Sequence, residues 1–476
     1  MAKNSMAMAI VQFTGQVSTL ILAMVLSRSL GDDYTTYTAA FSIAALLFLI
    51  ADLGLGVKLV IDVAQERSTA SSKLTSVLFI RGTMGIVAIL LTLTIVVIQD
   101  LPSDVAFAYM IIALSTGLGW IAQTFTSMFT AYERMHYVLM TSLVERAFTV
   151  SISIALVLLG YGLEVVVMVV LVGSMLYVIL SYTVCSRLIV KPSRKISLAQ
   201  VKEELKGSAP FAINIALVST LYAVNGFLLL SIVWGMDGLE AGQLANTQFY
   251  IAFNLVVSLI AVPTVFRTAL LPVIARLFGS SKEMTKLAQQ KVMKYMYTIG
   301  LPMTLGGMVL ADQIIALLFP NYPESATVLR VLLPVLAISY FGTGQGSLLA
   351  AAKLMHLSTI SSAAGAATNL VLCFLAIPVL GPVGAALAFT VATLVTNLIS
   401  HHYMSKRVVK LKVSEIIVRP TLAGLGMTAV LLLLPWDNLF LSIVIGVAVY
   451  FILLIALKAV DQDDIDIFRK AVNRKA

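Results

Sequence analysis

Charged residues are scarce in this sequence. They make up 12% of its 476 positions, whereas a soluble globular domain has about 25%. Apolar residues account for 59% of the chain instead. This composition excludes an ordinary soluble domain and predicts an all-α polytopic membrane protein.

Cysteine and histidine are scarce as well. The two cysteines, Cys185 and Cys373, lie in separate apolar segments and match no metal or redox spacing. The four histidines form no metal-ligand pattern. We therefore expect no metal site and no cofactor.

Basic residues outnumber acidic ones, and the formal net charge is +9. The lysines and arginines nevertheless fall in short clusters between apolar segments, which is typical of membrane topology signals. This arrangement disfavours a nucleic-acid partner.

Apolar runs occupy most of the chain. Fourteen of them reach or exceed the length of about 20 residues that a helix needs to cross a bilayer. They lie at 6–30, 35–63, 75–99, 105–131, 138–160, 164–186, 209–233, 242–273, 292–318, 328–350, 357–379, 382–404, 414–435 and 439–458. The sequence therefore predicts fourteen transmembrane helices.

The loops between these runs alternate in charge. Lysines and arginines gather at 65–74, 132–137, 187–208, 274–291, 351–356 and 405–413. The opposite loops contain neither and are acidic or rich in turn residues: 99–104, 160–164, 235–242, 319–325, 380–384 and 435–438. By the positive-inside rule, we expect both termini on the cytoplasmic side of a cell membrane.

An internal repeat suggests the domain organisation. SMFTAYERMH at 127–136 and SLLAAAKLMH at 347–356 match at Ser, Ala, Met and His with a constant offset of 356 − 136 = 220. Two parallel six-helix lobes followed by an extra helix pair would explain this offset. The expected boundaries are 1–186 for the first lobe, 187–208 for a cytoplasmic amphipathic linker, 209–404 for the second lobe, and 405–476 for the last helix pair and tail.

Three charges lie in the apolar run at 35–63: Asp52, Lys58 and Asp62. A central Asp or Lys costs roughly 2.5 to 3.5 kcal/mol in a lipid-facing helix, so these residues should face a protein interior or a wet cavity. Lys58 and Asp62 are four residues apart and can pair on one helical face. Asp52 lies about 15 Å deeper than Asp62. Ion coupling through Asp52 and Asp62 is a hypothesis that rests on these two acids.

Arg267 is the next candidate, because it lies between Pro263 and Pro272 in a helix that should be kinked. Aligning the two halves places it at a depth similar to that of Lys58. Two cations facing a shared cavity suit a phosphate or pyrophosphate group. The alternative is that each cation pairs with a carboxylate and fixes helix packing.

Other charges within the apolar runs are weaker candidates. Arg146 follows Glu145 about two turns inside its run and is expected to snorkel or to form a pair within the bundle. Asp312 and Arg330 flank the loop at 319–325, where a structural role is expected.

Several motifs resemble one transporter family. They are SRSLGDDY (27–34), IADLGLG (50–56), AYERMHYV (131–138), SAPFA (208–212) and ALLFPNYPESATVLRVL (316–332). In order and spacing they are similar to the polysaccharide transporters of the multidrug/oligosaccharidyl-lipid/polysaccharide exporter superfamily, which include the O-antigen flippases. One departure is that no glycine follows Tyr34.

This resemblance implies two six-helix lobes arranged as a V, alternating access, and a lipid-linked oligosaccharide as cargo. Related flippases use cations of helices 1, 2 and 8, which correspond here to Arg28, Lys58 and Arg267. We therefore expect a flippase, not an enzyme, that moves a polyprenyl-(pyro)phosphate-linked oligosaccharide to the outer leaflet for polysaccharide assembly. Its partners would be that lipid, membrane lipids and other assembly proteins.

The sequence leaves two alternatives to a flippase. A multidrug/cation antiporter of the same superfamily is the main alternative, but a lysine and an arginine in the cavity would repel cationic drugs. An intramembrane glycosyltransferase would need reactive residues in sizeable outer loops, and the loops of this sequence are too short.

Overall fold

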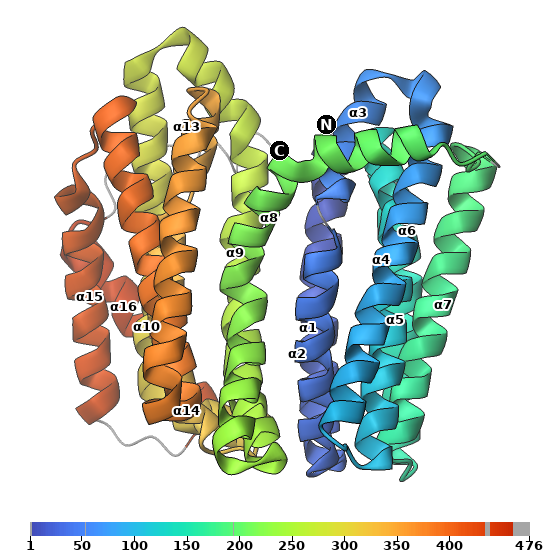
Figure 1. The fold of residues 1–476 in the computed structure, drawn as a ribbon. Coiled ribbons are helices and arrows are strands. Elements are labelled where there is room, and N and C mark those ends of the chain that lie inside the picture. The colour runs from blue at the N-terminus through green and yellow to red at the C-terminus, as the bar shows by residue number, and fades with distance from the viewer. Residues whose placement is uncertain (1, 53, 194, 434–437, 460–476) are drawn as a thin grey trace. The chain divides into compact units, whose positions relative to one another are not determined.

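The computed structural model describes residues 2–52, 54–193, 195–433 and 438–459. Within these ranges it leaves out the side chains of 2–6, 50–52, 209–211, 213–215, 218–222 and 265–280. The described secondary structure is entirely helical (Figure 1). The predicted all-α class is therefore confirmed for this part of the chain.

The helices follow one another with short connections. Their bounds are α1 Ala2–Ser29, α2 Asp33–Asp52, α3 Leu55–Gln65, a 3-10 turn at Arg67–Thr69, α4 Ala70–Ile98, α5 Ser103–Ala131, α6 Met135–Leu158, α7 Leu163–Leu188, α8 Leu198–Asp237, α9 Leu239–Ser280, α10 Lys282–Leu318, α11 Ser325–Leu332, α12 Pro334–Phe341, α13 Gln345–Ala351, α14 Met355–Arg407, α15 Val413–Leu433 and α16 Leu439–Ala456.

Eleven helical stretches among the described residues are long and apolar enough to cross a membrane. The predicted count of fourteen is not established by this number and stays a prediction. Part of the difference lies in α14, which has 53 residues and contains the two predicted spans 357–379 and 382–404. The backbone leaves helical geometry inside it at Gly381, where φ is 53° and ψ is −128°.

The predicted span at 35–63 is interrupted in the structure. Helix α2 ends at Asp52, and Gly54 adopts the left-handed conformation with φ 70° before α3 begins at Leu55. Glycine takes this conformation without the steric penalty of a Cβ atom, so the chain can redirect there. Lys58 and Asp62 consequently lie on α3, a separate helix of 11 residues.

The later part of the predicted linker 187–208 is the start of a longer helix. Residues 198–208 form the first part of α8, which continues to Asp237. Figure 1 shows this first part crossing the ends of neighbouring helices before α8 turns to run along the bundle. Ser197 caps the helix, since its side chain accepts a hydrogen bond from the Gln200 backbone N–H.

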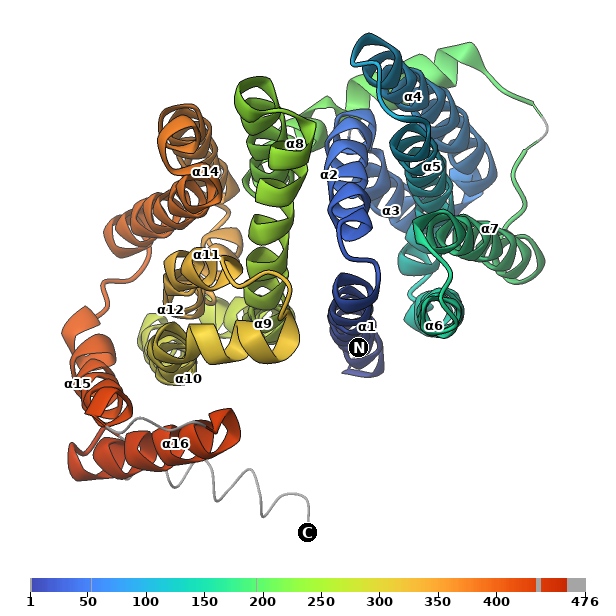
Figure 2. The same ribbon diagram turned by 90° about the horizontal axis from the view of Figure 1, so that it is seen from below.

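The chain forms two compact units. Unit 1 comprises Met1–Ala261 and Ser362–Ala392, and unit 2 comprises Val262–Ser361 and Thr393–Ala476. In unit 1, α5 packs against α7, α4 and α2, and Figure 2 shows α4 and α7 beside it. In unit 2, α10 packs against α12 and α15, and α15 packs against α16. The predicted division at 186, 208 and 404, and the V-shaped pair of lobes, stay predictions.

We expect Gly381→Ala to lower the free energy of unfolding by roughly 1–3 kcal/mol, because an L side chain is strained at this backbone conformation. Gly82→Ala is the matched control, since Gly82 lies inside α4 and a Cβ there would meet open space. That change should be neutral or stabilising by up to about 1 kcal/mol. Thermal unfolding in detergent measures both variants, and equal melting temperatures would contradict the prediction.

Candidate functional site

Two adjoining pockets lie in unit 1, with volumes of about 270 and 370 Å³. They share Tyr37 and Phe41 of α2 and Glu145 and Thr149 of α6. The first pocket is also lined by α1 and by Tyr250 of α9, and the second by residues of α5 and α7. We call the two pockets together the unit 1 cavity.

Arg146 lies in the wall of this cavity and reaches across to α1. Its Nη1 atom donates a hydrogen bond of 2.9 Å to the backbone oxygen of Val11. A Cβ atom at Gly15 would lie 1.9 Å from the same Nη1 atom, so the missing side chain at position 15 makes room for the guanidinium. The cation is thus held against α1 at the edge of the cavity.

Glu145 and aromatic rings complete the polar part of the wall. Thr149 Oγ1 donates to Glu145 Oε1 at 3.2 Å. The ring of Tyr37 lies 4.9 Å from that of Phe41 and 6.1 Å from that of Tyr34, measured between centroids. A guanidinium can bind phosphate oxygens through two parallel hydrogen bonds, and aromatic walls with few polar groups are typical of small-molecule sites.

Glu145 and Arg146 contribute more to this cavity than the sequence indicates. The sequence predicts that Arg146 snorkels or pairs within the bundle, and in the structure it bonds to the α1 backbone beside a cavity. An adjacent acid and base two turns inside an apolar run was the available signal. The partners of Glu145 and Arg146 on other helices depend on tertiary packing. The spacing of residues along one helix does not reveal those partners.

Lys58 lies in a cluster of four charges formed by α3, α4 and α8. Its Nζ atom is 2.6 Å from Asp62 Oδ2 and also donates to Glu204 Oε2. Lys73 Nζ is 2.7 Å from Asp62 Oδ2 and 4.0 Å from Glu204 Oε1. We call these four residues the ion cluster. It is largely enclosed, since the Glu204 side chain is 3% exposed.

The predicted pair between Lys58 and Asp62 is confirmed. The sequence does not reveal Lys73 and Glu204 as partners, because it predicts Lys73 in a loop and Glu204 in a linker on the membrane surface. A Cβ at Gly207 would lie 2.4 Å from Lys58 Cε, so this glycine of α8 admits the lysine side chain. Because two carboxylates already bind Lys58, anion binding by this residue would require the cluster to open.

The other predicted site residues are placed less completely. Asp52 ends α2 and Arg267 lies within α9, but their side chains fall outside the described residues. Arg28 lies in the last turn of α1 and is exposed. The substrate roles of Arg28, Lys58 and Arg267 and the coupling roles of Asp52 and Asp62 stay predictions. Arg330 and Asp312 form an ion pair, as a structural role for them requires.

Arg81 of α4 was overlooked in the sequence, although it lies six residues inside an apolar run. It is 5% exposed. Its Nη1 atom donates to the Trp120 carbonyl at 3.1 Å and to Thr124 Oγ1 at 3.0 Å. The guanidinium carbon also lies 5.3 Å from the centre of the Trp120 ring. Since Trp120 lines the unit 1 cavity, Arg81 helps to fix one wall of it.

A buried polar seam joins α2 to the first turns of α9. Thr38 Oγ1 and Thr247 Oγ1 are 2.6 Å apart, and Ser42 Oγ donates to Asn246 Oδ1 at 3.0 Å. Gln243 Nε2 donates to the hydroxyl of Tyr109 at 3.2 Å. We call these hydrogen-bonded residues, together with Thr36, which donates to Gln243 Oε1 at 3.4 Å, the polar seam. Polar but uncharged side chains, rather than apolar ones, form this contact.

Among the residues that the structure describes, no three or more His, Cys, Asp or Glu side chains gather as a metal ion would need. The groups that the unit 1 cavity offers for binding are a guanidinium, a carboxylate, hydroxyls and aromatic rings.

Comparison with protein families gives a match over residues 1–278, to the family described as polysaccharide biosynthesis protein. The chain belongs to this family. The resemblance expected from the sequence motifs is thereby confirmed. No individually curated protein matches the sequence.

Solved structures share the fold of this polysaccharide biosynthesis family protein. Lipid II flippase MurJ, in an inward closed conformation, gives a TM-score of 0.75 at 14% identity, covering 93% of this chain and 97% of that chain. An inward-facing multidrug resistance MATE family transporter of the MOP superfamily gives 0.63 at 13% identity, covering 84% and 98%. A MOP superfamily transporter from Pyrococcus furiosus gives 0.57 at 12% identity, covering 85% and 94%.

We expect Lys58→Met to lower the free energy of unfolding by roughly 3–5 kcal/mol, because Glu204 would stay buried with its main counter-charge removed. Adding Glu204→Met should recover most of this loss, since the remaining Asp62 and Lys73 neutralise each other. Urea unfolding in detergent measures the free energy of unfolding of the wild type, of both single variants and of the double variant. The control is Lys202→Met, an exposed residue of the same helix α8. A double variant as unstable as Lys58→Met would contradict the cluster's role.

Proposed function

We propose that the protein is a flippase that moves a polyprenyl-(pyro)phosphate-linked oligosaccharide from the cytoplasmic to the outer leaflet by alternating access. The observation that carries the proposal is Arg146, held beside aromatic rings in the unit 1 cavity. Family membership and the shared fold with a lipid II flippase support it. The activity is transport, and the lipid tail would stay in the bilayer while the head group crosses.

The cavity chemistry suits such a head group. The guanidinium would bind phosphate oxygens, and the rings of Tyr37, Phe41 and Tyr250 would offer flat apolar surfaces to sugar rings. In this proposal Lys58, Arg267 and Arg28 supply further cations, and Asp52 and Asp62 couple transport to an ion gradient. Both termini would be cytoplasmic, and other polysaccharide-assembly proteins would receive the product.

The polar seam suits an interface that opens to water during transport. Exposing an apolar contact costs about 25 cal/mol per Å². Hydrogen bonds between neutral side chains exchange for hydrogen bonds to water at a net cost of only about 0.5–1.5 kcal/mol each. The hydroxyls and amides between α2 and α9 would therefore allow these helices to separate at a low free-energy cost.

A multidrug/cation antiporter is the second candidate, and Glu145 is the observation that favours it. This carboxylate lines both pockets of the unit 1 cavity and could bind a coupling cation or a cationic drug. Drug-resistance assays distinguish the two functions. Resistance that depends on Glu145, with normal glycan export, would replace the flippase by the antiporter.

We expect a disulfide between Thr38→Cys and Thr247→Cys to block transport, because the two hydroxyls are in contact and the bond would hold the polar seam closed. Reductant should restore export of the lipid-linked glycan. The two single variants under the same oxidant are the controls. Undiminished transport with a fully formed disulfide would show that this seam does not open.

We expect Arg146→Ala to reduce export roughly tenfold to a hundredfold, the range for loss of a hydrogen bond to a charged group. Lipid-linked glycan should then accumulate in the cytoplasmic leaflet at matched protein levels. Arg146→Lys should restore export in part, because it keeps the charge but not the bidentate geometry. Gly15→Ala should give an intermediate loss, since its Cβ displaces the guanidinium.

Two further arms make this experiment decisive. Arg187→Ala is the control, because Arg187 is an exposed arginine at the end of α7 that does not line the cavity. Arg267→Ala and Arg267→Lys test the predicted second cation in the same assay. Normal export by Arg146→Ala at equal abundance would assign Arg146 to helix packing and remove the main support for the flippase.

A further inference from the structure

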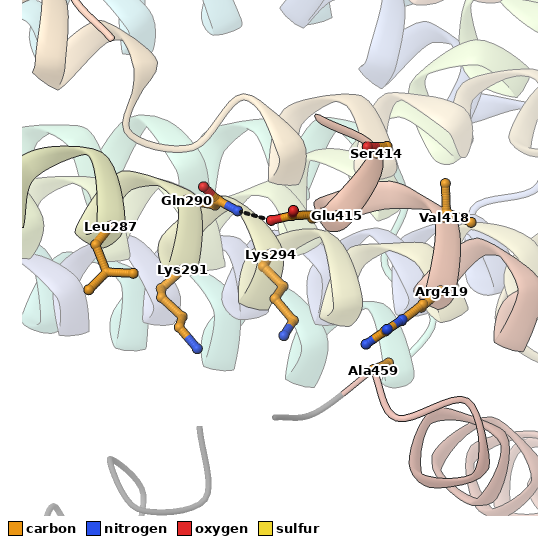
Figure 3. A pocket seen from close by; sticks show the side chains of 9 residues that line it. All are labelled: Leu287, Gln290, Lys291, Lys294, Ser414, Glu415, Val418, Arg419 and Ala459. Atoms are coloured by element: carbon orange, nitrogen blue, oxygen red, sulfur yellow. Dashed lines mark hydrogen bonds between the residues drawn. The ribbon is translucent and has the colours of Figure 1, made fainter. Parts of the chain in front are cut away.

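A third pocket lies in unit 2 between α10 and α15, with a volume of about 510 Å³. Its charged lining comes from Lys291 and Lys294 of α10 and from Glu415 and Arg419 of α15 (Figure 3). Ala459, which follows α16, completes the wall. The unit 1 cavity and the ion cluster share no residue with this pocket.

Positive charge predominates in this pocket. Its carboxylate, Glu415, accepts hydrogen bonds from Gln290 at 2.9 Å and from Lys412 at 2.8 Å. The hydrogen bond to Glu415 raises the pKa of Lys412, which lies in the loop before α15. Figure 3 shows Lys291, Lys294 and Arg419 extending to the side away from the Gln290–Glu415 hydrogen bond. Three cations close together favour a ligand with several negative charges.

The described chain ends at this pocket and continues into an acidic sequence. Arg419 Nη1 donates a hydrogen bond of 2.5 Å to the backbone oxygen of Lys458, so the chain enters the pocket at this point. The sequence that follows Ala459 is VDQDDID, which places four aspartates at 461, 463, 464 and 466. These residues lie outside the described part of the structure. At about 3.3 Å per extended residue, the first three can reach within roughly 7–17 Å of Ala459.

We propose that the acidic segment 461–466 binds in this pocket and that its aspartates pair with Lys291, Lys294 and Arg419. The covalent connection gives the segment a high effective concentration there, which a free anion or a lipid head group lacks. Binding would hold the end of α16 against α10 and α15, in addition to the contacts that α15 and α16 already make. The proposal is independent of the transported substrate.

Limited trypsin digestion of the full-length protein in detergent tests this, because Arg469 and Lys470 lie within four residues of the end of the acidic segment. Docking should protect these sites. Replacing both pocket lysines, by Lys291→Gln with Lys294→Gln, should speed cleavage at 469 and 470 about tenfold, as expected from losing two exposed ion pairs. The control is Lys282→Gln with Lys353→Gln, which removes the same charge from two exposed lysines outside the pocket.

The reciprocal change identifies the occupant. Asp463→Asn with Asp464→Asn should speed the same cleavage by a similar factor, and combining it with the lysine changes should add little more, because both remove one interaction. Cleavage of either variant pair at the wild-type rate would overturn the proposal. Acceleration by the lysine changes alone, with unaltered cleavage of the aspartate variant, would overturn it in favour of another anion.

Discussion

A charge exposed to hydrocarbon costs several kcal/mol, and the described charges within unit 1 are arranged to avoid that cost. Lys58 contacts two carboxylates, and Arg81 donates to a carbonyl and a hydroxyl. Arg146 donates to a backbone oxygen of α1. Apart from the pair of Lys58 with Asp62 inside α3, each of these contacts joins two different helices. These charges therefore stabilise the packing among α1, α3, α4, α5, α6 and α8.

Polar contacts of two kinds can serve two mechanical roles. The ion cluster is buried and charged, so opening it would expose unpaired ions, and it suits a rigid joint between α8 and the helices α3 and α4. The polar seam is neutral, and its hydroxyls and amides can exchange their partners for water at little cost. In the proposed transport cycle, the seam would open at little cost, whereas the ion cluster would open only where an anionic group replaces the carboxylates bound to Lys58.

Small residues determine where two of the cations can lie. Gly15 leaves the space that the Arg146 guanidinium occupies against α1, and Gly207 leaves the space for the Lys58 side chain against α8. A methyl group at either position would collide with the cation. Close approach of helices at small residues is common in membrane proteins. Here it also positions the charged groups of the cavity wall and of the ion cluster.

The sequence by itself determined the membrane class, the helical fold and the family, because composition and the length of apolar runs decide whether a segment suits lipid. It also determined the pair of Lys58 with Asp62, since residues four positions apart lie on the same face of a helix. The tertiary structure decided that Glu204 and Lys73 join this pair, that Arg146 lines a cavity, and that Gly54 divides the span predicted at 35–63. Such partners are separated by up to 146 positions. Only the packing of helices, which local pattern does not specify, brings them together.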